Sequence, residues 1–440
     1  MLKQQKIFFD FLRFCIGPAK EIPGSLKEVD WKELYAIAKK QCLVGVLFDG
    51  IKKLPAEHVE MEKELLLRWM AESQMLEKAN VRLNDAAIQV SEWFRKKGFR
   101  TCILKGQGNA LMYPNPYCRT PGDIDIWVEG EDNRVISFVR SISPHEKACY
   151  HHIEFPSYKG VEVEVHYRPS FLLCFRHNRK LQKYYDRVKE EQFSHRVMLG
   201  EQGEIAIPTM EFNLIFQLTH IFSHLMNEGI GLRQLVDYYY VLCDFYKVYQ
   251  NSSKITPSLF TIKEGSTSHP DPLTLRGEGE TAPSRRSEPL RSKVGGPSKV
   301  SPECLCGVNR LACDSPVSEN AVMAAYELAA LQRELKHLGL WKFAGAVMYV
   351  LYEVLGLSEE KMIAPMDEKR GKLLLAEILN GGNFGQHFTK YGHFTQQGMA
   401  KKYFLKIWRN MHFVRYYPAE ALSEPIFRTW HFFWRLKNKK

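Results

Sequence analysis

Two aspartates separated by a single residue, Asp123 and Asp125, are the side chains of this sequence best placed to do chemistry. They alternate with isoleucines in Asp-Ile-Asp-Ile-Trp-Val, a short apolar run that predicts a β-strand. Successive side chains of a strand point to opposite faces, so both carboxylates share one face, roughly 7 Å apart along the chain. Their mutual repulsion is relieved by a divalent cation, and Mg²⁺ keeps coordination positions for phosphate oxygens. The pair therefore predicts a Mg²⁺ site, which Mn²⁺ could also occupy.

A second acidic strand is predicted by the sequence Val-Glu-Val-Glu-Val-His. Its strict alternation places Glu162, Glu164 and His166 on one face. An acidic face is common on a solvated edge strand. If this strand lies beside the first one, however, one of the glutamates joins the two aspartates. The residues alone leave both interpretations open.

The elements that must position these strands are expected to be mostly helical. Apolar residues recur at helical spacing over residues 1–98, where Gly98 is placed to end the last helix. Short β-branched and aromatic runs separated by turn residues occupy 99–170. Helical patterns return over 171–249 and 320–440. We predict an α+β fold, mostly α, in which a small sheet core is flanked by N-terminal and C-terminal helical regions.

Residues 250–319 have a different composition from the rest of the chain. They are rich in Ser, Pro, Gly and Thr and contain few large apolar side chains. Such a segment cannot bury enough apolar surface to offset the entropy lost on ordering. We predict that it is a disordered insertion.

Charge and apolar patterning narrow the choice of partners and location. The 440 residues carry a net charge of +11, which favours anionic partners such as nucleotides, with nucleic acid less favoured. The sequence contains no uninterrupted apolar run of about 18 residues, so we predict no transmembrane helix. Asp10 and Arg13 interrupt the apolar N-terminal stretch, which argues against a cleaved signal peptide. The 10 cysteines lack framework spacing, so we expect reduced thiols and a cytoplasmic protein.

Two further features allow more than one interpretation. His220 and His224 lie one helical turn apart and could bind zinc, but no third ligand accompanies them, so we favour packing or substrate contact. The C-terminal residues 399–440 mix aromatic with basic side chains. We favour a helix that packs on the core, and a weak contact with an anionic membrane surface is the alternative.

The order of these motifs resembles the nucleotidyltransferase superfamily of the DNA polymerase β type. In that pattern a Gly-containing turn opens a helix, a strand with two alternating carboxylates follows, and a later strand adds a third. The resemblance implies that the small sheet core is a mixed sheet. More specifically, the chain is similar to a bacterial family of uncharacterised nucleotidyltransferases. The matching positions are 104–106, 113–114, Arg119, 122–125, Glu164, His166, 229–234 and Asp237.

The resemblance implies roles for these residues. Asp123, Asp125 and Glu164 would be catalytic and would hold the metal ion. Glu164 is chosen over Glu162 because of its spacing to His166. Nucleotide binding is implied for a second set of residues. In it, Lys105 and Arg119 would contact phosphates unless they are plain surface charges, and Gly106 would let the backbone approach the phosphates. This set is Lys105, Gly106, Gln107, Arg119, His166, Arg233 and Asp237.

The reaction implied is transfer of an NMP group from an NTP, expected to be ATP, to an unidentified small molecule, glycan precursor or protein. Two other readings compete with it. Gln107 occupies a position where the superfamily commonly has Ser or Gly, which would suit an inactive nucleotide-binding relative. The basic aromatic C-terminus would suit an interaction protein of surface-polysaccharide biosynthesis.

Overall fold

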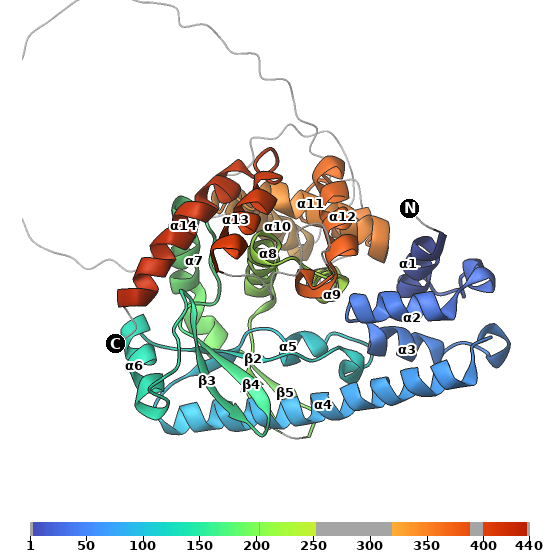
Figure 1. The fold of residues 1–440 in the computed structure, drawn as a ribbon, viewed down its shortest axis with the longest axis horizontal. Helices are drawn as coiled ribbons and strands as arrows, with labels where there is room; N and C mark the ends of the chain where they lie inside the picture. The colour runs from blue at the N-terminus through green and yellow to red at the C-terminus, as the bar shows by residue number, and fades with distance from the viewer. Residues whose placement is uncertain (1–2, 202, 252–318, 388–398, 438–440) are drawn as a thin grey trace, which may run out of the picture. The chain divides into compact units, whose positions relative to one another are not determined.

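The fold is taken from a computed structural model, which describes residues 3–201, 203–251, 319–387 and 399–437. The predicted insertion at 250–319 therefore lies almost entirely outside the described residues. Within the described part, helices account for most of the residues, and a small sheet lies among them (Figure 1). The predicted class, α+β and mostly α with helices on both sides of a small mixed sheet, is confirmed. The division of the chain into five regions stays a prediction.

A four-stranded sheet carries the acidic residues. Its strands are β1 (Thr101–Ile103), β2 (Ile124–Val128), β3 (His152–Tyr158) and β4 (Val161–His166), in the spatial order β1-β2-β4-β3. β1 runs antiparallel to β2, β2 parallel to β4, and β4 antiparallel to β3. The sheet is thus mixed, and the two acidic strands, β2 and β4, are direct neighbours.

Helices precede, connect and follow these strands. Those before the sheet are α1 (Lys3–Ile16), α2 (Trp31–Lys40), α3 (Val44–Ile51) and α4 (Lys63–Lys96), and those between its strands are α5 (Gln107–Ala110) and α6 (Asp132–Ile142). Those after it are α7 (Phe175–Ser194), α8 (Met210–Asn227), α9 (Leu232–Asn251), α10 (Glu319–His337), α11 (Trp341–Leu355), α12 (Glu368–Gly381), α13 (Met399–Met411) and α14 (Pro418–Lys437). Short 3₁₀ turns are η1 (Gly24–Glu28), η2 (Ala56–His58), η3 (Pro116–Cys118), η6 (Glu359–Lys361) and η7 (Asn383–Gly385).

The two faces of β2 pack into different cores. Ile124 and Ile126 are fully buried in a cluster with apolar side chains of α4, the long helix that runs beneath the strands in Figure 1. Trp127 faces the other way, with ring centroids 4.7 Å from Phe193 and 5.8 Å from Phe212. The alternation in the sequence therefore separates the isoleucines from the carboxylates, because neighbouring residues of a strand project to opposite faces.

Gly98 ends the long helix α4, as predicted. The helix stops at Lys96, and Gly98 takes the left-handed conformation with φ +81°. The backbone N–H of Phe99 then donates to the carbonyl of Phe94 at 3.1 Å, which closes the helix end. A glycine is favoured here because a side chain in this conformation would clash with the backbone. The chain can then turn directly into β1.

One element departs from the expected helices over 171–249. A hairpin of β5 (Arg196–Leu199) and β6 (Gly203–Ala206) is inserted between α7 and α8. Its turn contains Gly200, with φ +57°, and the alternating apolar residues are too few to give a clear period-2 signal by themselves.

To cross a membrane, a helix must be long and apolar enough. Among the described helices, no single one is long and apolar enough to cross a membrane. One bent pair of helices, Tyr326–His337 with Trp341–Leu355, meets this requirement when the two are taken together, by length and composition alone.

Candidate functional site

Strand pairing brings Glu164 beside Asp125. The two residues are Cα partners in the parallel pair of β2 and β4, and Asp123 stands one residue before β2. Both aspartates and Glu164 line one cavity of about 470 Å³. Glu162, two residues earlier on the same face of β4, is exposed to solvent. The pairing therefore joins one of the two glutamates to the aspartates.

Alternating positive and negative groups surround the buried carboxylate of Asp125, which is 4% exposed. Lys105 Nζ lies 2.8 Å from its Oδ2, and His166 Nε2 lies 2.9 Å from its Oδ1. The same His166 nitrogen is 3.4 Å from Glu164 Oε2, to which His152 Nδ1 also approaches within 3.2 Å. Three strands thus contribute to one continuous polar network.

The two aspartates differ in their electrostatic environment. The pKa of Asp123 is raised, first by repulsion from the charge of Asp125 and then by burial. Burial also opposes ionisation of Asp125, but Lys105 and His166 outweigh it and hold the pKa of Asp125 well below its usual range. Negative charge is therefore compensated at Asp125 and uncompensated at Asp123. A cation bound between them would relieve this imbalance.

The histidines around the network have opposite protonation preferences. Burial lowers the pKa of His152 to about 4, with repulsion from His166 adding to the effect, and burial also lowers the pKa of His151 well below 6.5. Burial alone would lower the pKa of His166 too, but hydrogen bonds to Asp125 and Glu164 raise it to about 9. His166 is therefore a cation at neutral pH, whereas its two histidine neighbours are neutral.

The metal-free protein should lose stability as the pH rises through about 9. Because folding raises the pKa of His166 from 6.5 to about 9, its contribution is fully present below pH 6.5 and is lost as the pH passes the higher value. Thermal unfolding in chelator, followed from neutral pH upward, measures this for the wild type and for His166→Asn. The stability advantage of the wild type should shrink across this window, and a constant advantage would contradict the assignment.

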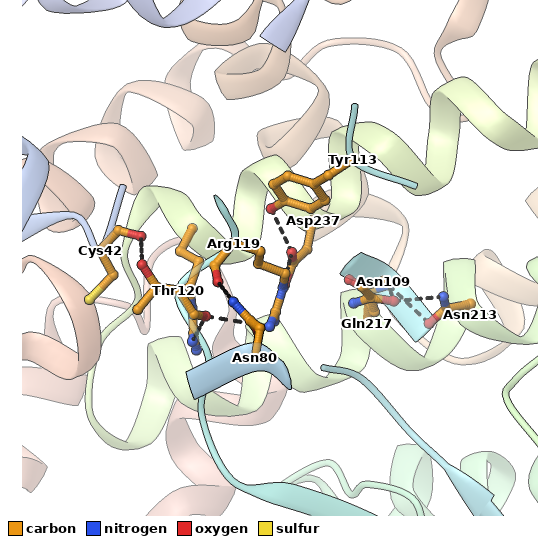
Figure 2. Close-up of polar contacts among 10 residues, drawn as sticks. Cys42, Asn80, Asn109, Tyr113, Arg119, Thr120, Asn213, Gln217 and Asp237 are labelled. Carbon is orange, nitrogen blue, oxygen red and sulfur yellow. Dashed lines mark hydrogen bonds and ion pairs between the residues drawn. The ribbon is translucent and has the colours of Figure 1, made fainter. Parts of the chain in front are cut away.

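A second ionic cluster, around Asp237, lies in the wall of the same cavity. Arg119 donates from Nε and Nη2 to the two carboxylate oxygens, each at 2.8 Å, and the Tyr113 hydroxyl donates to Oδ1 at 2.7 Å (Figure 2). Burial opposes the charge, but Arg119 keeps the pKa of Asp237 below its usual value. Nη1 of Arg119 donates to the carbonyl of Thr120 at 3.4 Å, so all three guanidinium nitrogens are engaged. The predicted phosphate contact of Arg119 stays a prediction.

Within the part of the chain that the structure describes, the guanidinium group of Arg233 has fewer hydrogen-bond partners than that of Arg119. It lies one helical turn before Asp237, yet the ion pair of Asp237 is made with Arg119. Arg233 donates from Nη1 to the carbonyl of Thr120 at 3.1 Å, and its buried Nε has no hydrogen-bond partner among the described residues. It also lines the cavity. Arg233 therefore offers an unused donor to an anionic ligand.

Gly106 lies in the turn between β1 and α5, and Gln107 is the first residue of α5. Gly106 has φ +55°, a conformation that favours glycine. Gln107 is 1% exposed, and neither polar atom of its side chain has a partner among the described residues. Unlike the other predicted site residues, these two are not among the described side chains that line the cavity. Gln107 is buried beside the site and does not face it.

Sequence reasoning missed an amide cluster in the cavity wall. Asn109 Oδ1 accepts from Asn213 Nδ2 and Gln217 Nε2, both at 3.1 Å (Figure 2). The Nδ2 of Asn109 is buried without a partner among the described residues, so it is a further donor toward a ligand. Only the proximity of Asn109 to Gly106 in the sequence could have indicated it.

The histidine pair of α8 does not have the environment of a zinc site. His220 Nε2 lies 3.2 Å from Lys105 Nζ, and His224 Nδ1 lies 3.4 Å from Glu228. A positive ammonium group beside the imidazole competes with a metal ion. Both histidines line the cavity, so substrate contact, one of the two roles that we favour, stays a prediction.

The acidic residues have the donors that a divalent cation requires. One ligand atom each from Asp125, Glu164 and His166 lie within 4.8 Å of one another. Asp123 belongs to the same face and carries uncompensated charge. Carboxylate oxygens are the ligands that Mg²⁺ and Mn²⁺ prefer, so these side chains can hold such an ion.

A small mixed sheet with carboxylates on neighbouring strands, flanked by helices, is the arrangement that a nucleotidyltransferase resemblance implies. A family model described as an uncharacterised nucleotidyltransferase matches residues 27–250, which is about half of the chain. The chain belongs to this uncharacterised nucleotidyltransferase family. No curated protein and no solved structure matches the chain.

Proposed function

We propose that the protein is a Mg²⁺-dependent transferase that moves an NMP group from an NTP, with ATP as the preferred donor, to an acceptor hydroxyl or similar nucleophile. The observation that carries the proposal is the register of β2 with β4. It sets Glu164 beside Asp125 at a cavity also lined by Asp123 and by cations suited to phosphates. The acceptor class is left open between a small molecule, a glycan precursor and a protein.

The proposed reaction is an in-line displacement at the α-phosphorus. A bond forms from the acceptor oxygen to phosphorus, the bond to the bridging oxygen breaks, and pyrophosphate leaves. Asp123, Asp125 and Glu164 would hold Mg²⁺, which when bound supplies charge neutralisation to the triphosphate. Glu164, the least enclosed ligand, could also accept the proton of the acceptor hydroxyl.

The surrounding cations support the binding of a triphosphate. Arg233 has an unused guanidinium nitrogen at the cavity, and Lys105 bridges Asp125 and His220 there. Asp237 would act through Arg119 by fixing the direction of the guanidinium group, since a bidentate pair holds the planar fork in one orientation. These contacts would place phosphates between the carboxylates and the basic wall.

A matched pair of substitutions tests which glutamate completes the site. Glu164→Gln should weaken Mn²⁺ binding by about tenfold or more, because one of the few carboxylate ligands is lost. Glu162→Gln, two residues away on the same face and exposed, should leave binding unchanged. The free Mn²⁺ signal in electron paramagnetic resonance, with and without ATP, measures both. Equal binding by wild type and Glu164→Gln would contradict the assignment.

A further inference from the structure

Three histidines at the ends of two neighbouring strands converge beside the carboxylate cluster. His152 is the first residue of β3, and His151 directly precedes it. His166 lies at the end of the neighbouring β4, where it is the Cα partner of His152. One nitrogen from each imidazole lies within 4.8 Å of the others, and Glu164 stands next to them. Imidazole is a ligand for zinc, iron, nickel and copper, whereas Mg²⁺ prefers oxygen. This corner of the cavity therefore differs in chemistry from the aspartate corner.

Three successive separations between donor atoms are close to those found in a tetrahedral metal site. His151 Nε2 lies 3.2 Å from His152 Nδ1, which lies 3.2 Å from Glu164 Oε2, which lies 3.4 Å from His166 Nε2. Four ligands arranged tetrahedrally at the usual zinc bond lengths, about 2.0–2.1 Å, are themselves about 3.3 Å apart. Each of these three separations is therefore close to one edge of such a tetrahedron.

A hydrogen bond and a ring contact on the far side of the imidazoles bear on their orientation. His166 Nδ1 lies 3.3 Å from the carbonyl oxygen of Arg168, to which it donates, so Nε2 is the nitrogen that faces Asp125 and Glu164. Metal-binding histidines usually donate their other N–H in this way. A metal ion bound at Nε2 would displace the proton that this nitrogen carries in the metal-free protein. His151 packs against Phe171 with ring centroids 4.8 Å apart, and its Nδ1 is buried without a hydrogen-bond partner among the described residues. All four side chains line the cavity, which gives an ion a path inward.

We propose that His151, His152, His166 and Glu164 form a second metal site, for Zn²⁺ or a similar transition-metal ion, beside the Mg²⁺ site of the aspartates. Because Glu164 belongs to both sites, an ion held by the histidines would fix its carboxylate next to Asp125. The histidine site requires neither nucleotide binding nor transfer. It can therefore exist even if the proposed reaction does not.

A similar trio elsewhere in the chain shows what a structural cluster of these residue types looks like. Cys174, His177 and Glu420 also have ligand atoms within 4.8 Å of one another. There, however, Glu420 Oε2 already accepts from the backbone N–H groups of Leu173 and Cys174, at 2.7 and 2.9 Å, and Oε1 contacts His177 at 2.9 Å. Its carboxylate is fully used in holding the chain, so this trio serves as an internal control.

The test uses the full chain, stripped of metal with a chelator and then dialysed against Zn²⁺ or Co²⁺. Wild type should retain one Zn²⁺ per chain, and Co²⁺ should give the visible absorption of a four-coordinate ion with nitrogen ligands. His152→Ala should weaken Zn²⁺ binding at least about 100-fold, since even outer partners of metal ligands are worth about 10- to 100-fold. His151→Gln is the second variant, in case His152→Ala fails to fold.

Two kinds of control separate this site from others. His177→Gln in the structural trio and His145→Gln on the surface should both leave Zn²⁺ binding unchanged. Asp123→Asn should abolish Mg²⁺-dependent nucleotide binding and still retain Zn²⁺, so failure of the proposed function leaves this test intact. The proposal is overturned if wild type binds no Zn²⁺, or if the folded His152→Ala or His151→Gln variant binds it as tightly as wild type.

Discussion

Asp123→Asn should lose nucleotide transfer by about 10³-fold or more while the protein keeps or gains stability. Loss of the charge that holds the cation removes several kcal/mol of transition-state stabilisation, and each 1.36 kcal/mol is about tenfold in rate. In the metal-free protein the same charge is unfavourable, because Asp125 repels it and raises its pKa. Removing it should therefore leave the unfolding temperature in chelator equal to or above that of wild type. Activity and stability are expected to move in opposite directions.

The matched control for this variant is Asp186→Asn, an exposed aspartate on α7 whose nearest cation, Lys189, is 3.6 Å away. It should change neither transfer nor stability, since exposed ion pairs contribute only about 0–1 kcal/mol. The measurements are the transfer rate at saturating Mg²⁺ and the thermal midpoint with and without metal. If Asp123→Asn keeps more than about a tenth of the wild-type rate, the negative charge of Asp123 does not contribute several kcal/mol of transition-state stabilisation, and the assignment is contradicted.

Arg119→Met should destabilise the protein by about 3–5 kcal/mol, which is the usual cost of leaving one partner of a buried ion pair uncompensated. Arg119 is 3% exposed and Asp237 is 5% exposed, so solvent cannot replace the lost partner. Urea unfolding at neutral pH measures the free-energy change. Because the pKa of Asp237 is lowered in the fold, its contribution is present above its ordinary value of 3.8 and is lost as the pH falls below it. The difference between the variant and wild type should therefore narrow in acid.

A double variant provides the control for the ion pair. Arg119→Met with Asp237→Asn removes both charges, and the Tyr113 hydroxyl keeps an oxygen to which it can donate. The double variant should recover most of the lost stability, as expected when the cost comes from the unpaired charge. A cost below about 1 kcal/mol for the single variant would mean that the pair is effectively solvated.

Local patterns in the sequence predicted what depends on local geometry. The alternation of aspartate and isoleucine in β2 follows from the pleat alone, and it correctly separates the carboxylates from the core formed with α4. Gly98 was placed correctly because a helix end favours glycine in the left-handed conformation. The mixed sheet followed from the family resemblance, not from any single strand.

Contacts between distant parts of the chain could not be predicted in the same way. Arg119 pairs with Asp237, which is 118 residues away in the sequence. The local alternative was an ion pair of Asp237 with Arg233, one turn earlier on the same helix. Whether Glu164 or Glu162 would lie beside the aspartates depended on the register of two parallel strands.

Histidine clusters show the same limit in another form. One-turn spacing drew attention to His220 and His224, yet the three converging imidazoles lie at the ends of adjacent strands. His152 meets His166 only because β3 pairs with β4 in the observed register. Residue spacing along a helix cannot predict which residues become neighbours across two paired strands.

The most direct test of the central claim is a search for the transferred group itself. Filtered cell extract would be incubated with Mg²⁺, isotopically labelled ATP and either wild type or Asp123→Asn, and then analysed by mass spectrometry for new labelled compounds. Our account predicts a labelled adduct that carries AMP, with release of pyrophosphate, in the wild-type reaction and in neither the variant nor a chelator control. Label found only in ATP and its ordinary breakdown products, for ATP and the other common NTPs alike, would contradict it.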